Sequence, residues 1–158
     1  MRGRAFGSLA LTLVLAVCSD EDGLPTSPLR TGNLEFTATS GVTRGSIPML
    51  HAAMRLRNVG TEPVTLETGG CPVLLYVYEA PRGMSRPIWD ARHSLCPGSL
   101  LHVTLEPDES RTFKSGAPVN DILGGRALKR VSVAATLRIA GRDDVVLPAG
   151  EVDLVPND

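Results

Sequence analysis

Residues 49–68 read MLHAAMRLRNVGTEPVTLET. One face of an extended chain over Met49–Asn58 carries four apolar residues: Leu50, Ala52, Met54 and Leu56. The opposite face carries a histidine, an alanine and two arginines, and this two-residue alternation is typical of an antiparallel strand with one buried face. Residues 58–63 are rich in turn formers, and the alternation resumes over Val64–Thr68. The segment therefore predicts a β-hairpin with a long loop.

Short apolar runs alternate with turn residues along the rest of the chain. They predict strands at 34–39, 73–78, 87–90, 100–105, 110–114, 129–139 and 145–155. The run at 73–78 is apolar throughout, which is typical of a strand covered on both faces. The glycine pairs at 69–70 and 124–125 predict turns, and 121–125 predicts one helical turn. The predicted fold class is all-β, an immunoglobulin-like antiparallel β-sandwich, with an up-and-down barrel as the alternative.

The N-terminal residues have the features of an export signal. Arg2 and Arg4 supply positive charge, Leu9–Val17 is an uncharged apolar run, and acidic residues follow from Asp20. Crossing a bilayer takes about 20 apolar residues, so the run predicts a cleaved signal peptide rather than a membrane span. We expect residues 1–17 to be this signal, 18–32 a flexible tether rich in acidic, Pro, Thr and Ser residues, and 33–158 the β-sandwich domain.

Two cleavage chemistries compete at the end of the apolar run. Leu15–Cys18 (LAVC) resembles the bacterial lipobox, which implies that Cys18 carries lipid and becomes the first residue. Val17 departs from the small residue usual there, and ordinary signal peptidase could instead cut after Cys18. The lipoprotein signal is our prediction. It places the chain in the cell envelope, on the periplasmic or extracellular face, with membrane contact through the lipid on Cys18 only.

The cysteine count fits an oxidising compartment. Cys18 belongs to the signal boundary, which leaves Cys71 and Cys96 as an even pair. An exported chain favours a disulfide between them, and two free buried thiols are the alternative.

The charge balance excludes one class of partner. Residues 18–158 keep all 17 acidic residues and 14 of the 16 basic ones, a formal charge of −3. A weakly acidic chain without a basic run is a poor nucleic-acid binder, so no nucleic-acid partner is expected.

A family resemblance emerges from motif order. The chain carries N-x-G-x-x-P-V-x-L (58–66), a tyrosine-bearing apolar strand (73–78), P-x-W-D (87–90) and L-x-P-x-E-S (105–110). This order is similar to the BsuPI-type intracellular proteinase inhibitor domain. The resemblance covers roughly Leu50 to Ile139 and implies an immunoglobulin-like sandwich, with protease inhibition as an alternative function. No inhibitory residue can be carried over, because no reactive loop matches.

Catalytic and metal motifs are missing from the sequence. It has no G-x-S-x-G, H-E-x-x-H or G-x-x-x-x-G-K-[ST] pattern. His51, His93 and His102 lie on separate predicted elements, so no metal site and no cofactor are expected. The single tryptophan, Trp89, is expected in the core beside the disulfide, with a binding-surface aromatic as the alternative. A secreted hydrolase with a site assembled from scattered residues is the weakest functional alternative.

These observations predict a non-enzymatic, lipid-anchored envelope protein that binds an unidentified protein or envelope component. Loops at the ends of such sandwiches are common contact sites. The loop at 80–86 carries three residues of types enriched at interfaces: Arg82, Met84 and Arg86. We predict it as the contact loop, with an ordinary exposed hairpin loop as the alternative.

Overall fold

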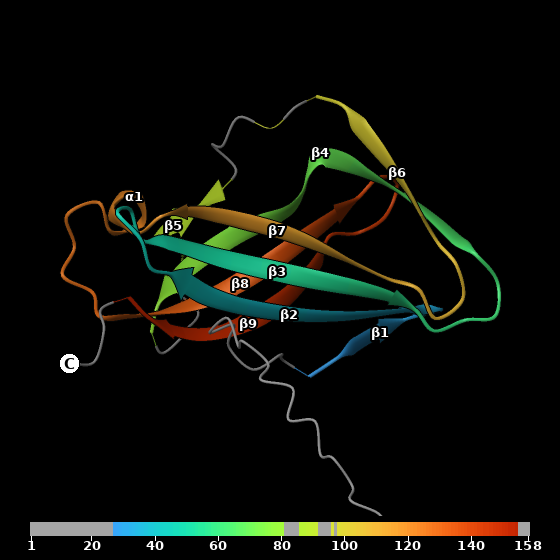
Figure 1. The fold of residues 1–158 in the computed structure, drawn as a ribbon, viewed down its shortest axis with the longest axis horizontal. Coiled ribbons are helices and arrows are strands. Elements are labelled where there is room, and N and C mark those ends of the chain that lie inside the picture. The colour runs from blue at the N-terminus through green and yellow to red at the C-terminus, as the bar shows by residue number, and fades with distance from the viewer. Residues whose placement is uncertain (1–26, 81–85, 92–95, 97, 155–158) are drawn as a thin grey trace, which may run out of the picture.

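The computed structural model describes residues 27–80, 86–91, 96 and 98–154, and these form an all-β sandwich of two packed antiparallel sheets (Figure 1). The first sheet has the order β1-β2-β3-β7, with the bounds Leu29–Thr31, Leu34–Thr43, Met49–Asn58 and Ser110–Pro118. The second has the order β5-β4-β8-β9, with the bounds Trp89–Asp90, Val64–Glu79, Arg130–Ile139 and Val145–Asp153. The strand β6, Leu100–Leu105, also pairs with β4, and the short helix α1, Val119–Leu123, follows β7.

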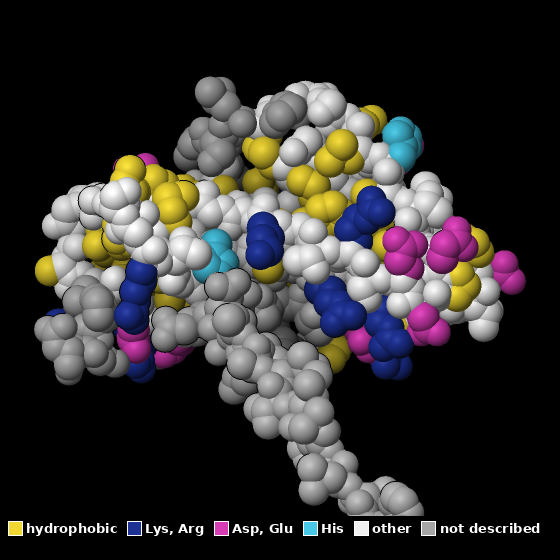
Figure 2. All heavy atoms as spheres, viewed as in Figure 1, with side chains coloured by type: hydrophobic (Ala, Val, Ile, Leu, Met, Phe, Trp, Pro, Cys, Tyr) yellow, Lys and Arg dark blue, Asp and Glu magenta, His cyan; other side chains and the backbone are white. Residues whose placement is uncertain are grey.

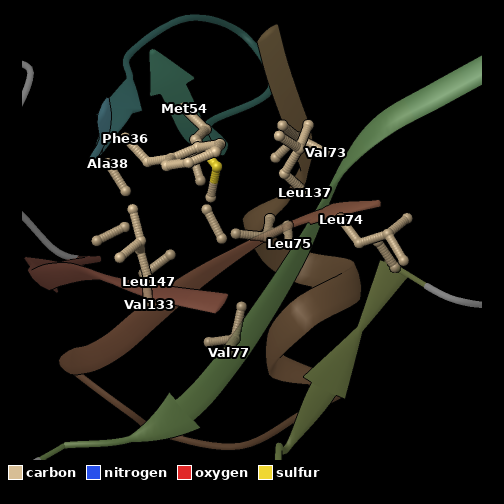
Figure 3. Packing of buried hydrophobic residues seen from close by; sticks show 14 of the residues in the cluster. Phe36, Ala38, Met54, Val73, Leu74, Leu75, Val77, Val133, Leu137 and Leu147 are labelled. Carbon is tan, nitrogen blue, oxygen red and sulfur yellow. The ribbon is translucent and has the colours of Figure 1, made fainter. Parts of the chain in front are cut away.

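The alternating face of β3 lies in the core, as predicted. Its four apolar residues are 0% exposed: Leu50, Ala52, Met54 and Leu56. They meet the inward residues of β4, β8 and β9 in one hydrophobic cluster between the sheets. Figure 3 shows Phe36 and Met54 of the first sheet facing Leu75 and Leu147 of the second. Burial of this shared face holds the two layers together.

The fourth strand differs from the prediction. The sequence predicted two strands separated by a glycine turn, whereas β4 is continuous over 16 residues. The prediction of a turn at Gly69-Gly70 is therefore wrong. The chain instead bulges there, because Thr68 pairs with Ile139 and the next pair is Val73 with Leu137. β8 pairs with β4 on both sides of the bulge, whereas along the other side of β4 the partner is β6 before the bulge and β5 after it.

Several strand ends also differ. Residues 29–31, placed in the tether by sequence, form β1 because their backbone pairs with Leu34–Phe36 of β2. β5 is only two residues long, and Pro87 before it cannot donate to a ladder. The helical turn predicted at 121–125 begins earlier, at Val119, and ends at Gly124 in the left-handed conformation.

A second bulge, in β9, accepts a hydrogen bond from the other sheet. β9 shifts register between the pairs Val133–Gly150 and Ala134–Pro148, and Gly150 has a φ of 101°. The extra residue is Ala149, whose carbonyl accepts a 2.7 Å hydrogen bond from the buried hydroxyl of Ser40 in β2. Ser40 thus occupies an inward position of β2 without leaving a buried polar group unsatisfied.

Candidate functional site

Several predicted site residues lie outside the described residues: Cys18, Arg82, Met84 and His93. Of the three predicted contact residues, only Arg86 is described, and it is exposed. The structure therefore does not test the lipid site or the loop as a contact surface.

The two described histidines are on different sheets. His51 lies on β3 and is half-buried, whereas His102 lies on β6, 3.3 Å from the Glu67 carboxylate. Within the described ranges, no group of three or more His, Cys, Asp or Glu side chains could hold a metal ion. The described part of the chain also contains no helix with the length and apolarity to cross a bilayer.

The predicted disulfide is confirmed. Cys71 and Cys96 are bonded, with their Cα atoms 5.4 Å apart and a sequence separation of 25 residues. Cys71 lies in the bulge of β4, and Cys96 lies in the segment that leads into β6. The bond therefore ties the irregular part of β4 to the segment preceding its neighbouring strand.

Asn58, the first residue of N-x-G-x-x-P, has a structural role. It is 0% exposed, and its amide group donates to the carbonyls of Glu62 (2.8 Å) and Leu105 (3.0 Å). Its side-chain oxygen accepts from the Gly60 N–H at 2.9 Å. Gly60 is required because a Cβ there would lie 2.6 Å from the Asn33 side chain. This motif fixes the β3–β4 loop against the end of β6.

The L-x-P-x-E-S motif closes the adjacent β6–β7 turn. Asp108 adopts a φ of 63°, its N–H donates to the Asn58 carbonyl at 2.9 Å, and its carboxylate pairs with Arg57 at 2.8 Å. The Glu109 carboxylate accepts from the Glu106 N–H at 2.9 Å. The two motifs therefore hold one end of the sandwich together.

Trp89 lies on β5, half-buried against the core cluster. It pairs with Val77, six residues along β4 from Cys71. Trp89 thus packs against the core through a strand at one end of β4, whereas the disulfide lies at the bulge.

The edges of the two sheets differ in their protection against further pairing. β1 has three residues with a central Arg30, and β5 has two residues. β7 carries Arg111 and Lys114, and β9 carries Pro148 and a bulge. Short length, charge, proline and bulges all discourage the addition of another strand.

β6 lacks all of these features. Its six residues, LLHVTL, include no Lys, Arg, Asp, Glu or Pro, and among the described strands β6 pairs only with β4. Leu100 is 58% exposed and Leu101 is 41% exposed. Figure 2 shows hydrophobic side chains gathered where β6 and β4 run side by side. β6 is therefore an open and partly apolar sheet edge without Lys, Arg, Asp or Glu.

A cavity of about 450 Å³ lies beside the disulfide. Its lining comes from the bulge of β4, from Leu100 at the start of β6, from the end of β8 at 138–139 and from the turn at 140–144 between β8 and β9. Arg138 and Arg142 line it, and no ion pair joins either guanidinium to another described side chain. The cavity therefore combines apolar walls with two arginines and one carboxylate, Asp144.

An ion pair with two hydrogen bonds lies away from both features. Arg130 on β8 binds Asp153 on β9 through two hydrogen bonds of 2.6 and 2.9 Å. Hydrogen bonding to Arg130 holds the pKa of the Asp153 carboxyl below its ordinary value of 3.8. The pair fastens the last strand to the sheet and has no open position for a ligand.

Comparison with known proteins gives no family. No family model and no curated protein matches the chain. Among solved structures, the β-glucosidase of Listeria innocua bound to glucose has 14% identity and a TM-score of 0.38, over 76% of this chain and 16% of that one. The β-glucosidase EmGH1 of Erythrobacter marinus has 17% identity and a TM-score of 0.36, over 73% and 15% of the two chains. The putative ApaA protein of Bordetella pertussis has 12% identity and a TM-score of 0.37, over 75% and 89%. This chain thus spans a small part of the glucosidases, and similarity at this level assigns no activity to it.

Proposed function

We propose that this chain is a non-enzymatic, lipid-anchored envelope protein whose immunoglobulin-like domain binds an extended segment of another envelope protein along β6. The observation that carries the proposal is the open edge of β6, which has no Lys, Arg, Asp or Glu, exposes two leucines and pairs only with β4 among the described strands.

Strand addition suits this edge for two reasons. Every second residue of an edge strand directs its N–H and C=O away from the sheet, so a partner in extended conformation gains backbone hydrogen bonds. Side chains that flank the edge supply selectivity, and Leu100 and Leu101 favour apolar residues at the matching positions of the partner. The other edges have charges, a proline or short length instead, which supports β6 as the single docking strand.

The anchor completes the proposal. Cys18 ends an apolar run, and an acidic, proline-containing segment separates it from the first strand at Leu29. A polar tether of this composition would let the domain sample partners near the membrane surface. Mass spectrometry of the mature N-terminus should find diacylglycerol on the Cys18 thiol. An unmodified chain that starts at Ser19 would contradict anchoring while leaving the β6 site open to its own test.

The docking site can be tested by photo-crosslinking in cells that express the full chain. A photoreactive amino acid replaces Leu101 on β6 or, as the matched control, Val146 on β9, which is 49% exposed on a protected edge. We expect a defined crosslinked band from position 101 and none from position 146. A second variant carries the photoreactive amino acid at Thr104 instead. Adding Leu101→Lys to this variant should abolish its crosslinked band, because a charge at the edge opposes pairing.

Three outcomes would overturn this site. Crosslinks from position 146 alone would move the contact to β9, and a product with twice the mass of the chain would identify a second copy as the partner. Loss of the position-101 band on replacing Arg82, Met84 and Arg86 with alanine would assign the contact to the predicted loop instead.

A further inference from the structure

We propose that the cavity beside the disulfide binds a small monocarboxylate with an apolar body, at a site that adjoins the start of the β6 edge and shares Leu100 with it. Its volume of about 450 Å³ falls in the range of small-molecule sites, which is about 300–1,000 Å³. Apolar walls with a few convergent polar groups are the usual composition of such sites.

The apolar body of the ligand is specified by the walls. Leu74 and Ile139 line the cavity and are 5% and 6% exposed, so both present surface that is already largely dehydrated. Leu100 also lines it and remains 58% exposed. A ligand that covers Leu100 removes apolar surface from water, which favours binding of an aliphatic or aromatic group.

The negative head group is specified by charge. Arg138 and Arg142 line the cavity, both are exposed, and neither forms an ion pair with another described residue. A planar guanidinium matches a carboxylate through two parallel hydrogen bonds. Asp144 lines the same cavity, so a second negative charge on the ligand would meet repulsion. The combination favours one carboxylate over a doubly charged phosphate.

The walls are held in place before a ligand arrives. The disulfide fixes Cys71 to Cys96, and both residues line the cavity. The β8–β9 turn is closed by a 3.2 Å hydrogen bond from the Arg142 N–H to the Ile139 carbonyl. The backbone of the site is therefore fixed, and the ordering cost of binding falls on the two arginine side chains.

Binding is tested with hexanoate as the probe and hexan-1-ol and hexylammonium as head-group controls. The full chain is carried in phosphatidylcholine nanodiscs, and empty nanodiscs give the blank for calorimetry. Hexanoate should bind at least tenfold more tightly than either control. Arg138→Gln with Arg142→Gln should remove that preference, whereas Arg111→Gln on β7 makes the same chemical change in the other sheet and should preserve it.

A second pair of variants tests the location. A Cβ added at Gly69, which lines the cavity, meets no atom within 4 Å, so Gly69→Leu adds an apolar side chain at the lining with no clash at its Cβ. It should weaken hexanoate binding at least tenfold, whereas Gly45→Leu in the β2–β3 loop should not. Equal affinity for all three probes, or hexanoate binding unchanged in both the double-arginine and Gly69→Leu variants, would overturn the proposal. Neither result bears on crosslinking from β6, which the arginine variants should leave unchanged.

Discussion

Replacing Asn58 with alanine should strongly destabilise the domain, although the residue lies at the end of a strand and outside the apolar core cluster. The side chain is 0% exposed and makes three hydrogen bonds, to the carbonyls of Glu62 and Leu105 and to the Gly60 N–H. Alanine removes all three and leaves the Leu105 carbonyl buried without this donor.

The magnitude follows from the burial of each bond. A hydrogen bond contributes about 0.5–1.5 kcal/mol net, whereas a buried group left without a partner costs about 1–3 kcal/mol. The Leu105 bond is buried and takes the larger figure, while the Glu62 and Gly60 bonds are part-buried and take the smaller one. We therefore expect the free energy of unfolding to fall by about 2–6 kcal/mol.

Asn58→Asp is the informative companion variant. A carboxylate can still accept from the Gly60 N–H, but it would face two carbonyl oxygens instead of donating to them. Burial and these carbonyls should raise the pKa of the new carboxyl in the folded state. A raised folded pKa means stability that is present at low pH and lost as the pH rises through that pKa. The variant should therefore be closer to wild type in stability at pH 4 than at pH 7.

Urea unfolding followed by Trp89 fluorescence measures both effects, because Trp89 is the only tryptophan and packs against the core. Asn120→Ala, at an exposed position in α1, is the control and should change stability by less than about 0.5 kcal/mol. A similarly small change for Asn58→Ala would refute the reasoning that this side chain holds the two loops together.

Three further predictions follow from other contacts. Cys71→Ser should lower the free energy of unfolding by about 2–5 kcal/mol in urea titrations; an equal stability of wild type with and without reductant would count against it. Ser40→Ala should cost about 1–3 kcal/mol, because the Ala149 carbonyl loses its buried donor; hydrogen exchange should show the loosening first in β9. Asp153→Asn should flatten the loss of stability on acidification below about pH 4, since the lowered pKa of Asp153 gives stability that disappears as the carboxyl is protonated. Thermal unfolding between pH 2 and 7 would measure this difference, and parallel curves for variant and wild type would exclude the contribution of the Arg130 pair.

Local periodicity predicted the strands because the burial of one face imposes it. Leu50, Ala52, Met54 and Leu56 alternate in the sequence and are all buried in the structure. The same rule failed at Gly69-Gly70, where two glycines are typical of a turn and instead lie in a bulge of one continuous strand. A bulge and a turn use similar residues, and the difference lies in whether distant strands pair on both sides.

The disulfide was predictable because only two cysteines remain after the signal boundary. The candidate sites were not predictable in this way. The open edge of β6 depends on strand order. The sequence LLHVTL does not show that, among the described strands, β6 pairs with β4 alone and leaves its other side open. The cavity depends on Arg138, Gly69 and Leu100 meeting from three different strands.

The sequence by itself determined the strand periodicity, the all-β class and the cysteine pair, because these depend on local pattern and on composition. Only the tertiary structure decided which edge of the sandwich stays open, where the arginines converge and why Asn58 is buried. Those features depend on contacts between residues far apart in the chain, such as Asn58 with Leu105 and Ser40 with Ala149. Such contacts form only when the two sheets pack together, so they cannot be predicted from the pattern of neighbouring residues in the sequence.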